Sequence, residues 1–113
     1  MKILKSQKDV SECASALKLP APILAELSKS VSLVEVVREE IPSARACVIL
    51  LVLEDKKAEI LRKHGINDLN AETSEDIDLG KEKWRREVYV IDDAGDGVII
   101  FRRASSLQKF DTE

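Results

Sequence analysis

The segment EVYVIDDAGDGVIIF, residues 87–101, sets the architecture of the C-terminal third of the chain. It contains two runs of β-branched and aromatic residues, which are the side chains that favour strands. Aspartate and glycine separate the two runs, as is typical of a turn. We therefore predict an antiparallel β-hairpin. Ala94 is a poor residue for the positive φ angles of a two-residue turn, so we expect a longer connecting loop.

Residues 46–53 form the longest apolar run, and they leave two interpretations open. The run suits a central strand that is covered on both faces. It also suits the first half of a buried helix over residues 44–64, because periodicity alone does not separate these structures. Length and β-branching favour the strand, whereas the lack of Gly, Pro or Asn before Glu54 favours the helix. Residues 55–64 are helical in both cases, and Gly65 follows where glycine commonly ends a helix.

The chain is expected to begin with a short edge strand over residues 1–5, followed by helices. Ser6 and Asp9 have the spacing of a capping box, which predicts that the first helix starts at Ser6. Pro20 ends this helix, because proline lacks the N–H that a helix interior requires. The apolar face of the helix is expected to comprise Val10, Cys13 and Leu17.

A second and a third helix are predicted between Pro22 and Ile41. Pro22 suits the first turn of the second helix. We expect the third helix to start at Ser32, because Glu35 lies three residues later and completes another capping-box spacing. The side chains of this third helix that should face inward are Leu33, Val34, Val37 and Ile41.

Together these elements predict an α+β fold, in which N-terminal helices pack on a small, largely antiparallel sheet that includes the C-terminal hairpin. A single helix over residues 44–64 would instead make the protein mostly helical with one hairpin. The length of 113 residues fits one domain, residues 1–113. Residues 66–82 are polar and mostly acidic, so we expect either one short helical turn there or a mobile acidic segment. Residues 106–113 are expected to fray.

The composition narrows the classes of function and location. The net charge is −3, which disfavours nucleic-acid binding because phosphate neutralisation dominates that affinity. The N-terminus has no apolar core of a signal peptide, and no apolar run approaches the roughly 18 residues of a membrane helix. We therefore expect a cytoplasmic protein without membrane contact, in which Cys13 and Cys47 are buried free thiols.

Two features resemble metal or catalytic sites, and both are interpreted as structural. The acidic turn, residues 92–97, would place Ala94 and Arg103 at ligand positions of an EF-hand loop, so a solvated turn is favoured over a calcium site. His64 is expected to interact with the C-terminus of its helix. A nucleophile pair between His64 and a cysteine would rest on residue types alone. We expect no metal and no cofactor, and the sequence favours a non-catalytic protein over an enzyme.

The candidate binding site is the open end of the hairpin, where cations gather around an aromatic side chain. If Arg86 lay opposite Arg103, these like charges would need an anion, supplied by residues 68–78 or by a partner. A register shifted by one would place Glu87 opposite Arg103 and remove that need. The residues of this candidate site are Trp84, Arg85, Arg86, Arg102 and Arg103.

Three classes of function remain open. A non-catalytic interaction protein, such as an accessory, inhibitor, immunity or chaperone-like subunit, is favoured by the lack of catalytic motifs and by acidic residues that could complement a basic partner. A small-ligand-binding domain or enzyme would need a pocket between helices and sheet, with Tyr89, His64 or Trp84 in its lining. A nucleic-acid-binding regulator would use the Trp84 cluster, although the acidic third helix is unsuited to recognition.

The hairpin also bears on self-association. Apolar residues occupy both of its faces, so both faces must be covered within the chain or pair with another copy. This pattern favours a homodimer, and the expected partner is a protein, which includes a second copy of this chain.

Overall fold

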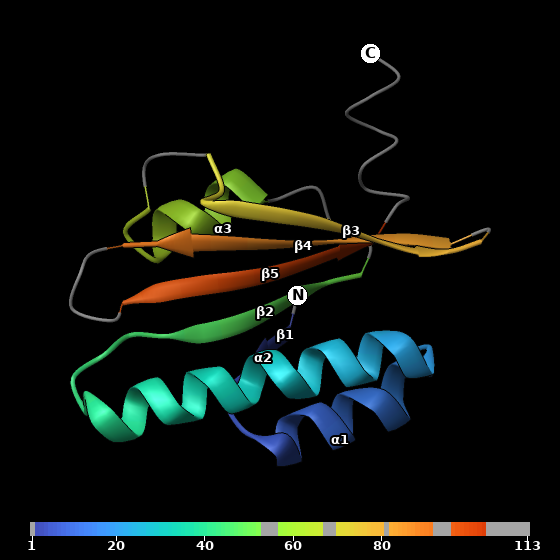
Figure 1. Cartoon of the computed structure of the whole chain (residues 1–113), viewed down its shortest axis with the longest axis horizontal. Helices are drawn as coiled ribbons and strands as arrows, with labels where there is room; N and C mark the ends of the chain where they lie inside the picture. Colours follow the sequence, from blue (N-terminus) through green and yellow to red (C-terminus); the bar gives the residue numbers. More distant parts are fainter. Residues whose placement is uncertain (1, 53–56, 67–69, 81, 92–95, 104–113) are drawn as a thin grey trace.

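The computed structural model describes residues 2–52, 57–66, 70–80, 82–91 and 96–103. Within this part, five strands form one sheet in the order β1-β2-β5-β4-β3, and three helices lie on its faces (Figure 1). The elements follow one another as β1 (Lys2–Leu4), α1 (Gln7–Leu17), α2 (Ala21–Glu40), β2 (Cys47–Leu51), α3 (Lys57–Lys63), β3 (Thr73–Leu79), β4 (Glu82–Val90) and β5 (Gly97–Arg103). The predicted α+β class is confirmed. The predicted frayed tail, residues 106–113, lies outside the described residues.

The strand β2 is the apolar centre of the sheet. It pairs antiparallel with β1 and parallel with β5, so both of its edges are hydrogen-bonded. All five of its residues are buried, because both faces of the strand are covered as well. The strand interpretation of this segment is therefore confirmed, and the alternative of one helix over residues 44–64 is wrong. The edge strand predicted at residues 1–5 is confirmed as β1.

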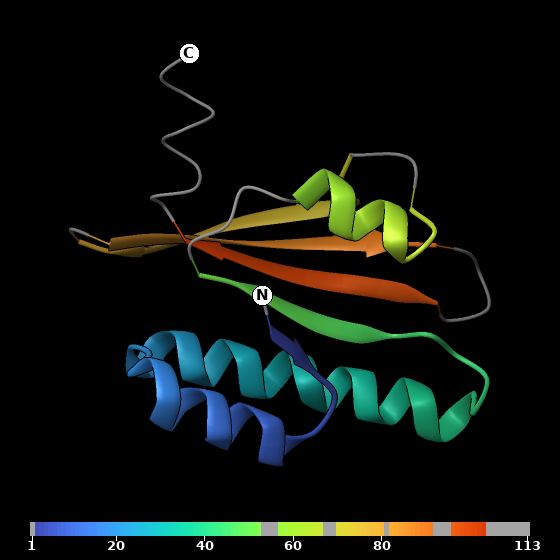
Figure 2. The ribbon, with the colours of Figure 1, turned by 180° about the vertical axis from the view of Figure 1, so that it is seen from behind.

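The sheet carries one apolar core on each face. The helices α1 and α2 pack on one face, and α3 packs on the other, which Figure 2 shows from behind. Alternation along β2 divides its side chains between these cores. The core under α1 and α2 includes Val48 and Leu50, whereas the core under α3 includes Cys47, Ile49 and Leu51.

The helix α1 begins as the sequence predicts. The Ser6 side chain accepts a hydrogen bond from the Asp9 N–H at 3.3 Å, and the Asp9 carboxylate accepts one from the Lys5 N–H at 2.9 Å. Val10 and Cys13 are buried. Leu17 is 38% exposed, so its predicted inward position is wrong.

The helix α2 is continuous over Ala21–Glu40, and the predicted break at Ser32 is wrong. Ser32, the predicted cap, and the nearby Ser30 instead form hydrogen bonds with neighbouring elements. The Gln7 side-chain amide donates to the Ser32 hydroxyl at 3.0 Å, and Arg86 Nε donates to the Ser30 hydroxyl at 3.2 Å. After Pro22 in the first turn, no Gly or Pro occurs before the end of the helix. The inward face of the continuous helix passes through Val34, and Leu33 is left 56% exposed, contrary to expectation.

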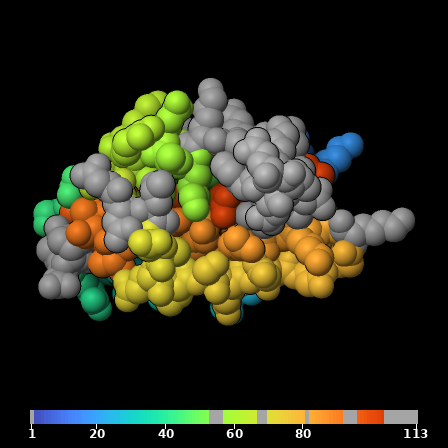
Figure 3. Space-filling model, turned by 90° about the horizontal axis from the view of Figure 1, so that it is seen from above, coloured from blue at the N-terminus to red at the C-terminus, as the bar shows by residue number. Residues whose placement is uncertain are grey.

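Part of the acidic segment forms a strand, where we had expected a short helical turn or a mobile segment. The strand β3 lies at the edge of the sheet and pairs with β4. Across this ladder, Glu75 lies opposite Arg86 and Asp76 lies opposite Arg85. Opposite charges across a ladder stabilise strand pairing, so the cations of β4 explain why such a polar segment adopts this structure. Figure 3 shows β3 and β4 along one margin of the surface, beside α3.

The hairpin of β4 and β5 is confirmed, and it closes with a hydrogen bond from the Ile91 N–H to the Asp96 carbonyl at 2.9 Å. This bond encloses residues 92–95, which lie outside the described part, so the connection is longer than two residues as expected.

The approach of the two hairpin strands at Gly97 generates the first prediction. A Cβ at Gly97 would lie 2.9 Å from the Tyr89 carbonyl oxygen, which is closer than real Cβ atoms come to other atoms. We expect Gly97→Ala to lower the free energy of unfolding by about 1–3 kcal/mol, measured by urea denaturation. The control is Ser74→Ala at the exposed edge strand, which should change it by less than about 0.5 kcal/mol. An unchanged midpoint for Gly97→Ala would contradict this packing.

Candidate functional site

The register of the hairpin separates the five residues of the predicted binding site. Both registers considered from the sequence are wrong, because Trp84 lies opposite Arg103 and Arg85 lies opposite Arg102. Since side chains alternate along a strand, Trp84, Arg86 and Arg103 belong to the face under α1 and α2. Arg85 and Arg102 belong to the face under α3. The five residues therefore do not form one surface.

The residues on the α1–α2 face are engaged within the chain. Trp84 is 1% exposed and belongs to the apolar core, so its ring is not accessible for stacking on a partner. Arg86 contacts Ser30 and lies 3.9 Å from a Glu75 carboxylate oxygen. Arg103 forms an ion pair of 2.8 Å with Glu82.

The two arginines on the α3 face form a like-charge pair across the hairpin, which had been predicted for Arg86 and Arg103. Arg85 and Arg102 are directly opposite each other, and each has its own carboxylate. Asp76 contacts Arg85 at 2.9 Å, and it comes from the acidic segment in which we expected such an anion. Glu87 contacts Arg102 at 2.6 Å and comes from the hairpin itself. The predicted like-charge pair of Arg86 and Arg103 is therefore wrong, and the arginines that do lie opposite each other have carboxylates of the chain as partners.

Glu87 is the centre of a buried polar network that the sequence did not predict. The residue is only 5% exposed. Its carboxylate accepts hydrogen bonds from Arg102 Nε at 2.6 Å, from the Tyr89 hydroxyl at 3.2 Å and from Lys57 Nζ at 3.4 Å. Lys57 Nζ also lies 5.9 Å from the centre of the Tyr89 ring, within the range of a cation–π contact. This network joins the start of α3 to the hairpin.

Burial perturbs the acid–base chemistry of this network. Burial lowers the pKa of Lys57, and Glu87 opposes that shift. Burial also raises the pKa of Tyr89, and the charge of Glu87 raises it further. Such perturbed groups are candidates for functional sites. Here Glu87 accepts from all three donors, so we interpret the network as a structural link between α3 and the sheet.

Asp96, the described acidic residue of the turn, has a structural role. The Asp96 carboxylate accepts hydrogen bonds from the Arg45 N–H and from Arg45 Nε. The backbone hydrogen bond and the side-chain bond from Arg45 hold the pKa of Asp96 below its usual range. His64 directly follows α3, as predicted, and Gly65 adopts a φ of +81°. Among the residues that the structure describes, no group of three or more His, Cys, Asp and Glu could hold a metal ion.

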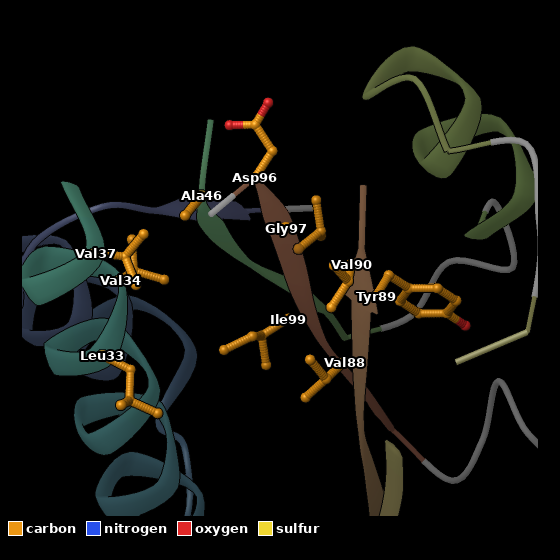
Figure 4. Close-up of a pocket in the computed structure, with 11 residues that line it drawn as sticks. Leu33, Val34, Val37, Ala46, Val88, Tyr89, Val90, Asp96, Gly97 and Ile99 are labelled. Carbon is orange, nitrogen blue, oxygen red and sulfur yellow. The ribbon is translucent and has the colours of Figure 1, made fainter. Parts of the chain in front are cut away.

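An apolar groove lies between α2 and the hairpin, and Figure 4 shows its lining. It has a volume of about 180 Å³. Val88 and Ile99 point toward α2, whereas the ring of Tyr89 points to the opposite side of the sheet. Leu33 and Val37 form the helix side of the groove.

The apolar surface continues from this groove over the outside of α2. Leu33 is 56% exposed and Val36 is 50% exposed, and both line a second hollow together with Lys29 and Ser32. Across the groove, Val90 is 51% exposed. This surface was not predicted from the sequence, because a new helix was expected to start at Ser32 with Leu33 facing inward. The spacing of apolar and charged residues along one uninterrupted helix would have indicated this exposed surface.

The pKa of Tyr89 generates a prediction about alkaline stability. The hydroxyl bond to Glu87 should make Tyr89→Phe less stable by about 1 kcal/mol at pH 8. Folding raises the pKa of Tyr89 above its ordinary value of 10.0, so the unfolded chain loses the phenolic proton first. The contribution of Tyr89 is therefore complete below about pH 10 and declines as pH rises further. The stability difference between the two proteins should shrink between pH 9 and about pH 11.

Urea denaturation at a series of pH values measures this difference. Tyr89 is the chain's one tyrosine, so no other phenol contributes to the comparison. Parallel stability curves for the native protein and Tyr89→Phe would contradict the burial of this hydroxyl against Glu87.

Comparisons of the chain with protein-family models, with curated proteins and with solved structures found no match. In the described residues, no helix is both long enough and apolar enough to cross a membrane. The case for a function therefore rests on the contacts, burial and charges of the chain itself.

Proposed function

We propose that the protein is a small non-catalytic interaction protein that assembles with a second copy of itself through α2. One observation carries this proposal. The exposed face of α2 carries a stripe with a cation at one end, two apolar residues in the middle and an anion at the other end. An antiparallel second copy of this stripe would therefore be complementary to it. The residues are Lys29, Leu33, Val36 and Glu40. We call this set the α2 stripe.

The α2 stripe is a continuous surface that faces away from the rest of the protein. Successive residues of a helix are about 100° apart, so these four residues fall within a stripe roughly 60° wide. All four are exposed. The face of α2 toward the sheet instead carries Leu27, Val31 and Val34, which are buried. The α1 side of the helix carries Ser28, which exchanges hydrogen bonds with Gln7.

The order of residues favours one orientation of the two copies. If two α2 helices cross antiparallel about a two-fold axis, Leu33 of one copy faces Val36 of the other. The same axis brings Lys29 of each copy to Glu40 of the other. A parallel arrangement would instead place lysine against lysine and glutamate against glutamate. Electrostatic complementarity of this kind fixes orientation and suppresses wrong arrangements.

The groove beside the stripe extends the apolar area available to a second copy. Leu33 belongs to both surfaces, and Val90 adds an exposed side chain on the hairpin side. The hairpin itself is covered by α2 on one face and by α3 on the other. Self-association was expected from the sequence because the hairpin could have an uncovered face. The proposal now depends instead on the exposed outer surface of α2.

Charges in the middle of the α2 stripe are expected to weaken assembly strongly. Leu33→Glu combined with Val36→Glu should weaken the dimer by roughly 100-fold, because carboxylates would enter an apolar contact. Sedimentation velocity over a concentration series measures the association constant. Leu17→Glu on α1 is the control, since Leu17 is also exposed, at 38%, but lies outside the stripe. A native chain that stays monomeric throughout the series would overturn the proposal.

Charge reversal tests the antiparallel orientation in the same assay. Lys29→Glu alone and Glu40→Lys alone should each weaken the dimer by roughly 5- to 30-fold, because two like-charge contacts form per dimer. The double variant should recover most of the native affinity. If the double variant is as weak as the single variants, Lys29 and Glu40 do not meet across the interface.

A further inference from the structure

A separate cavity, distinct from the groove and the hollow along α2, lies at the start of β2. It has a volume of about 290 Å³, and the charged and reactive side chains in its lining are Lys5, Arg38, Arg45, Cys47 and His64. Lys5 follows β1, Arg38 lies in the last turn of α2, and His64 follows α3. The fold thus brings cationic groups from separate segments to one hollow.

The lining of this cavity has a strong excess of positive charge. None of the described residues that line it is a carboxylate. Arg45 contacts Asp96 at 2.9 Å, and its side chain is still 65% exposed. In the described part of the chain, Lys5, Arg38 and His64 have no ion pair. Lys5 and Arg38 are therefore cations of this cavity that no carboxylate among the described residues pairs with.

Cys47 lines the same cavity as these cations. The thiol is buried at the first residue of β2, where the residue is 4% exposed. Burial raises the pKa of this thiol, and the charges of Lys5 and Arg38 both lower it. Two cations from different elements therefore act electrostatically on the same atom.

We propose that this cavity binds a phosphate group, held by Lys5, Arg38, Arg45 and His64. Guanidinium groups match the geometry of phosphate oxygens, and lysine supplies a further point charge. A volume near 290 Å³ lies at the small end of ligand sites, which range from about 300 to 1,000 Å³. The site therefore suits inorganic phosphate or the phosphate end of a small metabolite. Arg38 lies on the opposite side of α2 from Val36. Phosphate binding at this cavity and dimer formation through the α2 stripe can therefore be tested independently.

The chain's one histidine provides a direct probe of the site. The imidazole C–H signals of His64 can be followed by proton NMR at pH 8 while inorganic phosphate replaces chloride at constant ionic strength. We expect a saturable shift. Arg38→Gln should weaken the fitted affinity by roughly tenfold, because a charge-assisted bond is lost. The control is Lys8→Gln on α1, which removes the same charge outside the cavity and should leave the affinity unchanged.

The results that would overturn the proposal are a shift that grows linearly with phosphate, or one that Arg38→Gln does not alter.

A second measurement uses the unaltered chain. Cys13 is a matched control for Cys47, because it is also buried with a raised pKa. Its cavity contains one cation, Lys2, together with the carboxylates of Asp9 and Glu12.

Alkylation of the two thiols by iodoacetate and by neutral iodoacetamide, read by peptide mass spectrometry, compares the two cavities. We expect the ratio of the iodoacetate rate to the iodoacetamide rate to be roughly fivefold higher at Cys47 than at Cys13, because cations attract the anionic reagent. Phosphate should lower that ratio at Cys47 and leave it unchanged at Cys13. Equal ratios at both thiols, with or without phosphate, would count against an anion site.

Discussion

The burial of β2 on both faces and at both edges is the constraint on which the rest of the structure depends. Every residue of β2 is buried, so each face of the strand requires its own apolar layer. The pair α1–α2 supplies one layer and α3 supplies the other. Parallel pairing of β2 with β5 then brings Arg102 beside Leu51, where the guanidinium is removed from water. A buried charge of this kind needs a partner, and Glu87 provides it.

Local sequence patterns determine several parts of this fold, and these parts could be predicted. The Ser6 cap, the hairpin and Gly65 each depend on a few neighbouring residues. The features that could not be predicted depend on distant partners. Residues 73–79 form a strand because β4 supplies cations opposite their carboxylates. The helix α2 continues past Ser32, whose hydroxyl accepts a hydrogen bond from the distant Gln7 and does not cap a new helix. Local propensity gives no information about either partner.

The predicted binding site shows the same distinction between neighbours in sequence and neighbours in space. Trp84 and Arg85 are adjacent in the chain, yet alternation along β4 sends them to opposite faces of the sheet. One enters the apolar core, and the other pairs with Asp76. The four arginines of the hairpin are thus each paired with a carboxylate of the chain. An exposed apolar surface lies instead on α2, where Leu33 was expected to be buried.

The central claim is that two α2 helices pair antiparallel, and disulfide linking tests it most directly. Chains carrying Lys29→Cys or Glu40→Cys, each with Cys13→Ala and Cys47→Ala, are oxidised separately and as a mixture. The account predicts linked dimers in the mixture alone, because each position lies roughly 16 Å along the helix axis from its own copy. The mixed dimer also keeps one native Lys29–Glu40 pair. Equal linking of either chain by itself, or no linking of the mixture, would contradict the account.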